Sequence, residues 1–110
     1  MKKALIVIDM QNDFVDGALG TKEALEMLPR LIEKLERVVE ENQTDLIFTQ
    51  DTHGEDYLDT QEGKLLPVRH CIKKTHGWEI VSDLEEFVSV ARDIIEKKTA
   101  PKWIRAIKDS

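Results

Sequence analysis

The sequence predicts an α/β fold built on an open parallel sheet, and three features indicate it. An apolar run at residues 4–8 ends at Asp9, and a second apolar run at 45–50 ends at Asp51. An amphipathic segment lies between them. Strand, helix and strand within about 50 residues are typical of a βαβ unit, whose two strands are parallel.

The first run, Ala4-Leu5-Ile6-Val7-Ile8, is rich in β-branched residues and almost continuous. Such a run is typical of a parallel strand that is buried on both faces. Because ligands of open α/β sheets bind outside the carboxyl ends of the strands, Asp9 is a candidate functional residue. The alternative is that Asp9 only caps a turn, a common place for aspartate.

The segment after the first strand predicts a polar turn and then a long helix with one apolar face. Apolar side chains recur there at spacings of three and four, at Leu25, Leu28, Ile32, Leu35 and Val39. Pro29 fits best in the first turn of this helix or marks a kink, and Asn42 is a plausible end.

Two segments beyond the second strand are less regular. Residues 52–80 predict a long polar loop of the kind that is often functional in compact domains. Residues 81–97 fit either one helix or a short helix at 83–88 followed by a strand at 93–96 that ends at Lys97. A final short helix is expected from Pro101.

Length and charge exclude several classes of protein. The 110 residues form one domain with a net charge of −6, which argues against nucleic acid and anionic membranes as main partners. No apolar stretch is long enough to span a membrane or act as a signal peptide, so we expect a cytoplasmic protein. Cys71, the single cysteine, excludes an internal disulfide.

The charge changes sign along the chain. Residues 1–96 hold 11 basic and 21 acidic side chains, whereas residues 97–110 hold five basic and one acidic. Residues 98–110 therefore form an atypical basic C-terminal tail.

Asp51, His53 and His70 are candidate ligands of a divalent metal. Carboxylate and imidazole suit zinc, manganese or iron, and Asp51 and His53 leave the same strand end. A fourth protein ligand could come from Glu55, Asp56 or Asp59. The alternative is that the histidines are ordinary surface residues of a loop, as we expect for His76.

Lys97 and Cys71 each have two interpretations. If residues 93–96 are a strand, Lys97 joins Asp9 at one edge, where an Asp–Lys pair can hold a substrate and transfer protons. If they are helical, Lys97 is a solvated charge. Cys71 follows His70, but adjacent residues of an extended chain point to opposite sides, so a buried structural thiol is expected rather than a nucleophile.

Three motifs in order resemble the isochorismatase-like cysteine hydrolases, in the form seen in nicotinamidase-like members. They are Asp9-x-Gln11-Asn12-Asp13-Phe14 with Gly17-Ala18-Leu19, Thr49-Gln50-Asp51-Thr52-His53, and Leu66-Pro67-Val68-Arg69-His70-Cys71. The resemblance covers about residues 1–97. It implies a three-layer, Rossmann-like parallel sheet, of which this chain supplies about three strands with flanking helices.

The resemblance also implies a chemistry, the hydrolysis of a small amide such as nicotinamide through a cysteine thioester. Asp9 would be the acid/base and Lys97 the catalytic lysine. Asp51, His53 and His70 would hold a metal ion that orients the substrate. The remaining ligand has no clear counterpart, and Asp59, Glu55 or water would take its place.

This sequence departs from the family in two places. Lys74 replaces a glycine that often follows the His-Cys pair, and nothing corresponds to the downstream nucleophilic cysteine. We therefore expect an incomplete domain, the N-terminal half of such an enzyme, that is inactive alone. The alternative is a non-enzymatic half-domain that binds metal or self-associates, and exposed apolar surface would favour a homo-oligomer.

Overall fold

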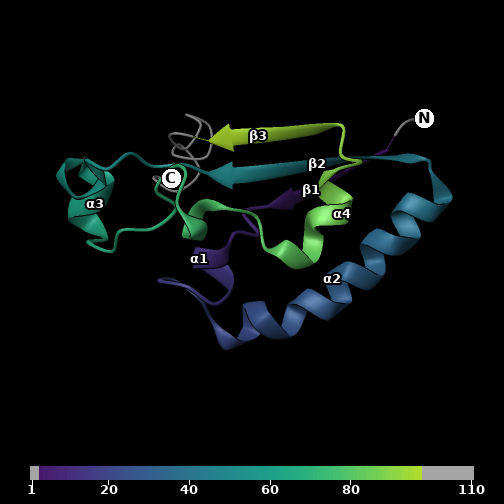
Figure 1. The fold of residues 1–110 in the computed structure, drawn as a ribbon, viewed down its shortest axis with the longest axis horizontal. Coiled ribbons are helices and arrows are strands. Elements are labelled where there is room, and N and C mark those ends of the chain that lie inside the picture. Colours follow the sequence, from purple (N-terminus) through teal and green to yellow (C-terminus); the bar gives the residue numbers. More distant parts are fainter. Residues whose placement is uncertain (1–2, 98–110) are drawn as a thin grey trace, which may run out of the picture.

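A computed structural model describes residues 3–97 and shows three parallel strands in one open sheet (Figure 1). The strands are β1 (Lys3–Ile8), β2 (Thr44–Asp51) and β3 (Asp93–Lys97), and β2 lies between the other two. The predicted α/β class is therefore confirmed. The tail at 98–110, with the helix expected from Pro101, lies outside the described residues.

The two interpretations of residues 81–97 are resolved in favour of a short helix followed by a strand. A 3-10 turn, η3 (Ser82–Leu84), leads into α4 (Glu85–Val88), and β3 follows. The Arg92 N–H donates to the Leu46 carbonyl at 2.8 Å, just before β3 begins. A strand here satisfies backbone groups on the free edge of β2, which a helix would leave unpaired.

The predicted long helix is α2 (Lys22–Glu41), and its ends are clearly marked. The Thr21 hydroxyl accepts from the Ala24 N–H at 3.0 Å, which fixes the start. Asn42 ends the helix in the left-handed conformation with φ 52°, as expected. The first-turn placement of Pro29 is wrong, because the Thr21 cap starts the helix earlier and leaves Pro29 inside it.

The Asn42 position gives a simple test of this helix end. We expect Asn42→Val to lower the free energy of unfolding by about 1–2 kcal/mol, since a β-branched side chain tolerates positive φ poorly. Asn42→Gly should be neutral or slightly stabilising. Urea unfolding of the two variants measures the difference, and equal midpoints would contradict the left-handed helix end.

The hydrophobic core lies between one face of the sheet and the helices α2 and α4 (Figure 1). Register places Val7 beside Phe48 on that face, and both are buried. The helices and the turn before α4 cover these side chains with other buried apolar residues, among them Leu28, Leu35, Leu84 and Phe87.

The opposite face of the sheet is open in the part of the chain that the structure describes. Alternation along the strands places Ile6, Ile8 and Ile95 there, and these residues are 52%, 62% and 48% exposed. The prediction that the first strand is buried on both faces is therefore wrong for residues 3–97. Within residues 3–97, no segment covers the face of the sheet on which Ile6 and Ile8 lie.

The predicted loop at 52–80 contains only short elements. They are the 3-10 turns η1 (Tyr57–Asp59) and η2 (His76–Trp78) and the helix α3 (Gln61–Leu65). The connection after β1 contains a further short helix, α1 (Asn12–Val15). None of the helices in residues 3–97 is both long and apolar enough to cross a membrane.

Candidate functional site

Asp9 and Lys97 form an ion pair at the carboxyl edge of the sheet. The Lys97 Nζ lies 2.8 Å from Asp9 Oδ2, and each side chain is about one quarter exposed. The Thr49 hydroxyl donates to the other carboxylate oxygen, Asp9 Oδ1, also at 2.8 Å. The pair thus joins residues that follow β1 and end β3, across the central strand, as the parallel topology predicts.

The backbone of Asp9 is held in an unfavourable conformation. Its φ is 54°, in the left-handed region that few non-glycine residues adopt. Its N–H lies 3.1 Å from the Thr49 carbonyl oxygen and 3.2 Å from the Thr49 hydroxyl oxygen. These contacts, with the Thr49 hydroxyl on Asp9 Oδ1, hold the carboxylate toward Lys97, because Thr49 lies at the end of the β1–β2 ladder, where Asp9 follows its partner Ile8.

The second cluster lies at the same edge and consists of Asp51, His53 and His70. One ligand atom from each lies within 4.8 Å of the others. Asp51 Oδ2 is 3.0 Å from His53 Nε2 and 3.6 Å from His70 Nε2. Because Asp51 pairs with Lys97 in the sheet register, this cluster adjoins the Asp9–Lys97 pair.

The surroundings of His70 determine which ring nitrogen faces the cluster. Its Nδ1 lies 2.7 Å from the Val68 carbonyl oxygen, which can only accept, so Nδ1 carries the proton. The Nε2 lone pair is then free to point toward Asp51. A backbone carbonyl that accepts from the other ring N–H is usual for a metal-binding histidine.

Aromatic rings enclose both histidines. The Tyr57 ring lies 4.6 Å from the His53 ring and 5.0 Å from the His70 ring, and Phe14 packs on His70 at 5.5 Å. The Tyr57 hydroxyl donates to the Leu66 carbonyl at 2.8 Å. Burial, with the carboxylates of Glu62 and Asp51, raises the pKa of Tyr57, so it remains a neutral wall of the site.

The three side chains fit a divalent metal ion by their chemistry. One carboxylate oxygen and two imidazole nitrogens converge, and the His70 tautomer presents a lone pair. The expected fourth ligands Glu55, Asp56 and Asp59 are not members of this group. A carboxylate that the sequence analysis did not name, Glu62, has its Oε2 3.9 Å from His53 Nδ1, although its side chain is 52% exposed.

Cys71 is buried, as expected for a structural thiol. It has no measurable exposure, and its φ of 50° places it in the left-handed region. Burial, together with the carboxylates of Asp51, Asp13 and Asp9, raises the pKa of the thiol above its ordinary range. A protonated, inaccessible thiol is a poor nucleophile.

This burial predicts the reactivity of Cys71. We expect iodoacetamide to leave the folded protein unmodified at neutral pH over a time that fully alkylates the urea-unfolded chain. Intact-mass spectrometry measures the added mass in both states. Rapid alkylation of the folded protein would contradict the buried position of the thiol.

Three residues to which the sequence analysis assigned no role contact the site residues at the carboxyl edge of the sheet. Gln11 is fully buried and hydrogen-bonds to the backbone of Asp51 through both its oxygen and its nitrogen. Thr49 contacts Asp9, and Tyr57 walls the histidines. The sequence marks Gln11 only by its position, as a polar residue directly after Met10 and close to the end of the first strand.

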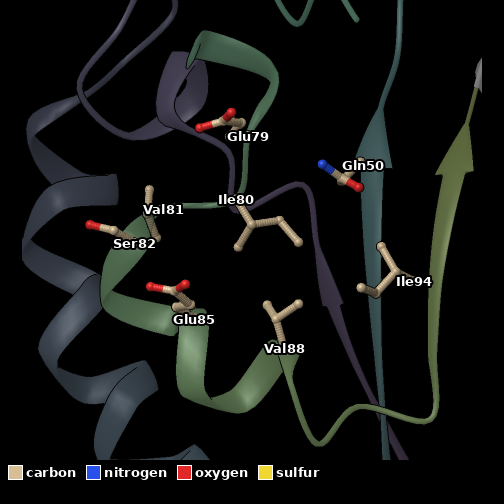
Figure 2. A pocket seen from close by; sticks show the side chains of 8 residues that line it. All are labelled: Gln50, Glu79, Ile80, Val81, Ser82, Glu85, Val88 and Ile94. Carbon is tan, nitrogen blue, oxygen red and sulfur yellow. The ribbon is translucent and has the colours of Figure 1, made fainter. Parts of the chain in front are cut away.

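A hollow on the surface of the described residues lies elsewhere. It has a volume of about 320 Å³, and in Figure 2 side chains from β2, β3 and the η3–α4 segment surround it. Gln50 and Ile94 line it from the helix-covered face of the sheet, opposite Thr49 and Ile95. The hollow is therefore separate from the Asp9–Lys97 pair.

Residues 3–105 match the family model described as the isochorismatase domain. The chain belongs to the isochorismatase family. The predicted resemblance is confirmed, and the fold agrees with it. No match was found among curated proteins.

Several solved structures resemble most of the chain. The pyrazinamidase of Pyrococcus horikoshii, in complex with zinc, is 37% identical with a TM-score of 0.72, over 92% of this chain and 54% of its own. The nicotinamidase of Bacillus subtilis is 33% identical with a TM-score of 0.72, over 89% and 56%. The N-carbamoylsarcosine amidase of Thermoplasma acidophilum is 28% identical with a TM-score of 0.66, over 88% and 52%.

The chain thus spans about half the length of these structures. All three names describe amidases of small molecules. The family match and the α/β fold of the structure therefore agree.

Proposed function

We propose that this chain carries the acid/base and metal-binding part of an amidohydrolase site for a small amide such as nicotinamide. The observation that carries the proposal is the Asp9–Lys97 ion pair, which adjoins the Asp51, His53 and His70 cluster at one sheet edge. The relatives named for nicotinamide and pyrazinamide hydrolysis support this substrate class.

In the proposed reaction Asp9 acts as the base and then as the acid. Its carboxylate would take the proton of a cysteine thiol that this chain does not itself supply, and the thiolate would attack the amide carbonyl carbon. The C–N bond then breaks, the proton leaves with the amine as ammonia, and water hydrolyses the thioester. Lys97, whose Nζ lies 2.8 Å from Asp9 Oδ2, orients that carboxylate by its positive charge.

Asp51, His53 and His70 would hold the ion in this proposal. The zinc complex of the Pyrococcus horikoshii relative favours zinc over manganese or iron. The ion would supply a Lewis acid that orients a ring nitrogen of the substrate. Tyr57 and Phe14 keep water from the buried side of the two imidazoles.

The described residues supply no nucleophile for this reaction. Cys71 is the single cysteine of the chain, and it is buried. Removal of a nucleophile from a catalytic unit costs several orders of magnitude in rate. We therefore propose that this chain is an incomplete domain and that it does not hydrolyse nicotinamide by itself.

Metal content tests the proposal most cheaply. We expect purified protein reconstituted with zinc and desalted to hold about one equivalent, and His53→Ala to hold much less. Elemental analysis measures the zinc, and an ammonia-release assay with nicotinamide accompanies it. Zinc retained by His53→Ala, or turnover that alkylation of Cys71 abolishes, would contradict the assigned roles.

The open face of the sheet favours a second candidate function, a self-associating half-domain. Ile6, Ile8 and Ile95 are exposed apolar residues on one face of the sheet. We expect a dimer in size-exclusion chromatography with light scattering, and Ile8→Lys should shift it toward monomer. A wild-type monomer at high concentration would contradict this candidate.

A further inference from the structure

Gln11 holds the backbone of Asp51 through its side-chain amide. Its Nε2 donates to the Asp51 carbonyl at 2.8 Å, and its Oε1 accepts from the Asp51 N–H at 2.9 Å. The same Nε2 also donates to the Trp78 carbonyl at 2.7 Å. Gln11 is completely buried, so no solvent competes for these hydrogen bonds.

These hydrogen bonds take the place of the backbone pairing that ends where β1 ends. The ladder between β1 and β2 ends at the pair Ile8 and Thr49, whereas β2 continues to Asp51. Beyond that point the backbone of Asp51 has no β1 residue to pair with. The Gln11 amide presents a donor and an acceptor in the place of a peptide group, which fixes the position of Asp51.

Asp13 acts in the same way on the other ligand segment. Its Oδ2 accepts from the Cys71 N–H at 2.8 Å, and Cys71 directly follows His70. The left-handed φ of Cys71 is strained for a non-glycine residue, so this hydrogen bond helps hold it there. A Cβ at position 77 would overlap the Asp13 carboxylate, which explains the glycine at Gly77.

We propose that Gln11 and Asp13 are positioning residues that set the distance between Asp51 and His70. They lie two residues apart in the connection after β1, and each fixes one ligand segment, so a single turn spans both. The proposal rests on the proposed function, because it concerns the ion that Asp51, His53 and His70 would bind. It assigns neither residue to the ion itself.

The test measures metal affinity and coordination geometry, without activity. Gln11→Met keeps the length of the side chain but removes the hydrogen bonds, and Asp13→Ala removes the acceptor. We expect each to weaken Zn²⁺ binding by about 10–100-fold in competition with a chelating dye, the range for such partners of metal ligands. The visible absorption of bound Co²⁺ should change in intensity, since the geometry of the donors changes.

Two further variants separate positioning from general destabilisation. Asp13→Asn keeps an oxygen acceptor for the Cys71 N–H and should restore affinity to within a few-fold of the unsubstituted protein. Leu35→Val trims the core on α2, outside the cluster, and should lower the urea midpoint but leave both the Zn²⁺ affinity and the Co²⁺ spectrum unchanged. If Gln11→Met does not fold, Gln11→Glu, which keeps the acceptor alone, replaces it.

The outcomes distinguish this inference from the proposed function. No Zn²⁺ binding by the unsubstituted protein would contradict the proposed function and the inference together. Binding by the unsubstituted protein with equal affinity and an identical Co²⁺ spectrum in the Gln11 and Asp13 variants would overturn the inference alone. An equal loss in Leu35→Val would overturn it too, because stability would then explain the effect.

Discussion

Replacing His70 by alanine should lower the affinity for Zn²⁺ by more than about 100-fold, beyond the loss expected for a residue that only supports a ligand. His70 supplies one of three converging donor atoms, and its Nδ1–H contact with Val68 already presents the Nε2 lone pair. Two remaining donors bind a divalent ion weakly. Competition with a chelating dye measures the change.

His76 provides the matched control for this prediction. It is an exposed histidine of the same loop, and in the structure it takes part through its backbone carbonyl, which accepts from the Asn12 side chain. His76→Ala should therefore bind Zn²⁺ like the unsubstituted protein. Equal affinities for His70→Ala and His76→Ala would show that the cluster is not the binding site.

Phe48→Ala should cost about 3–5 kcal/mol of the free energy of unfolding, which is most of the stability expected of a small domain. Phe48 is 1% exposed on the central strand and lies in the core with Val7 and Leu35. The helices cover only one face of the sheet in residues 3–97, so this core has no second layer to compensate. Urea unfolding followed by circular dichroism measures the loss.

Leu65→Ala is the control for that measurement. Leu65 is 80% exposed on α3, and its truncation should change stability by less than about 0.5 kcal/mol. A loss in Leu65→Ala comparable with that of Phe48→Ala would mean that the core does not lie where the structure places it.

The residues at the carboxyl edge of the sheet could be predicted from the sequence, because adjacent parallel strands end at the same edge. Two apolar runs ended at Asp9 and Asp51, and a third ended at Lys97 if it formed a strand. Once the strands are parallel and adjacent, their carboxyl ends must meet, so the Asp9–Lys97 pair follows from topology. The choice between helix and strand at 81–97 needed the tertiary pairing with β2, which periodicity does not contain.

Other features depended on partners that no local pattern reveals. The run at 4–8 predicted burial on both faces, yet Ile6 and Ile8 are exposed, because burial depends on what packs above a strand. The nearest additional carboxylate to His53 is Glu62, which is nine residues further along the chain. The path of the loop, with its short helix α3, decides that distance.

Gln11 illustrates the same limit at a buried position. Glutamine side chains are mostly exposed in folded proteins, whereas the amide of Gln11 is buried and pairs with the backbone of Asp51, forty residues away. The backbone groups of Asp51 that Gln11 pairs with are left without a β1 partner because β2 extends beyond the end of β1 in the register. The position of Asp51 in the cluster therefore depends on a contact that the periodicity of the sequence does not predict.

The central claim is that one edge of this sheet assembles Asp51, His53 and His70 as a metal site beside the Asp9–Lys97 pair. Crystals of the zinc-loaded protein, measured at wavelengths on either side of the zinc absorption edge, test it most directly. The account predicts one anomalous peak within bonding distance of Asp51 Oδ2, His53 and His70 Nε2. A peak at another location, or none at full zinc loading, would contradict it.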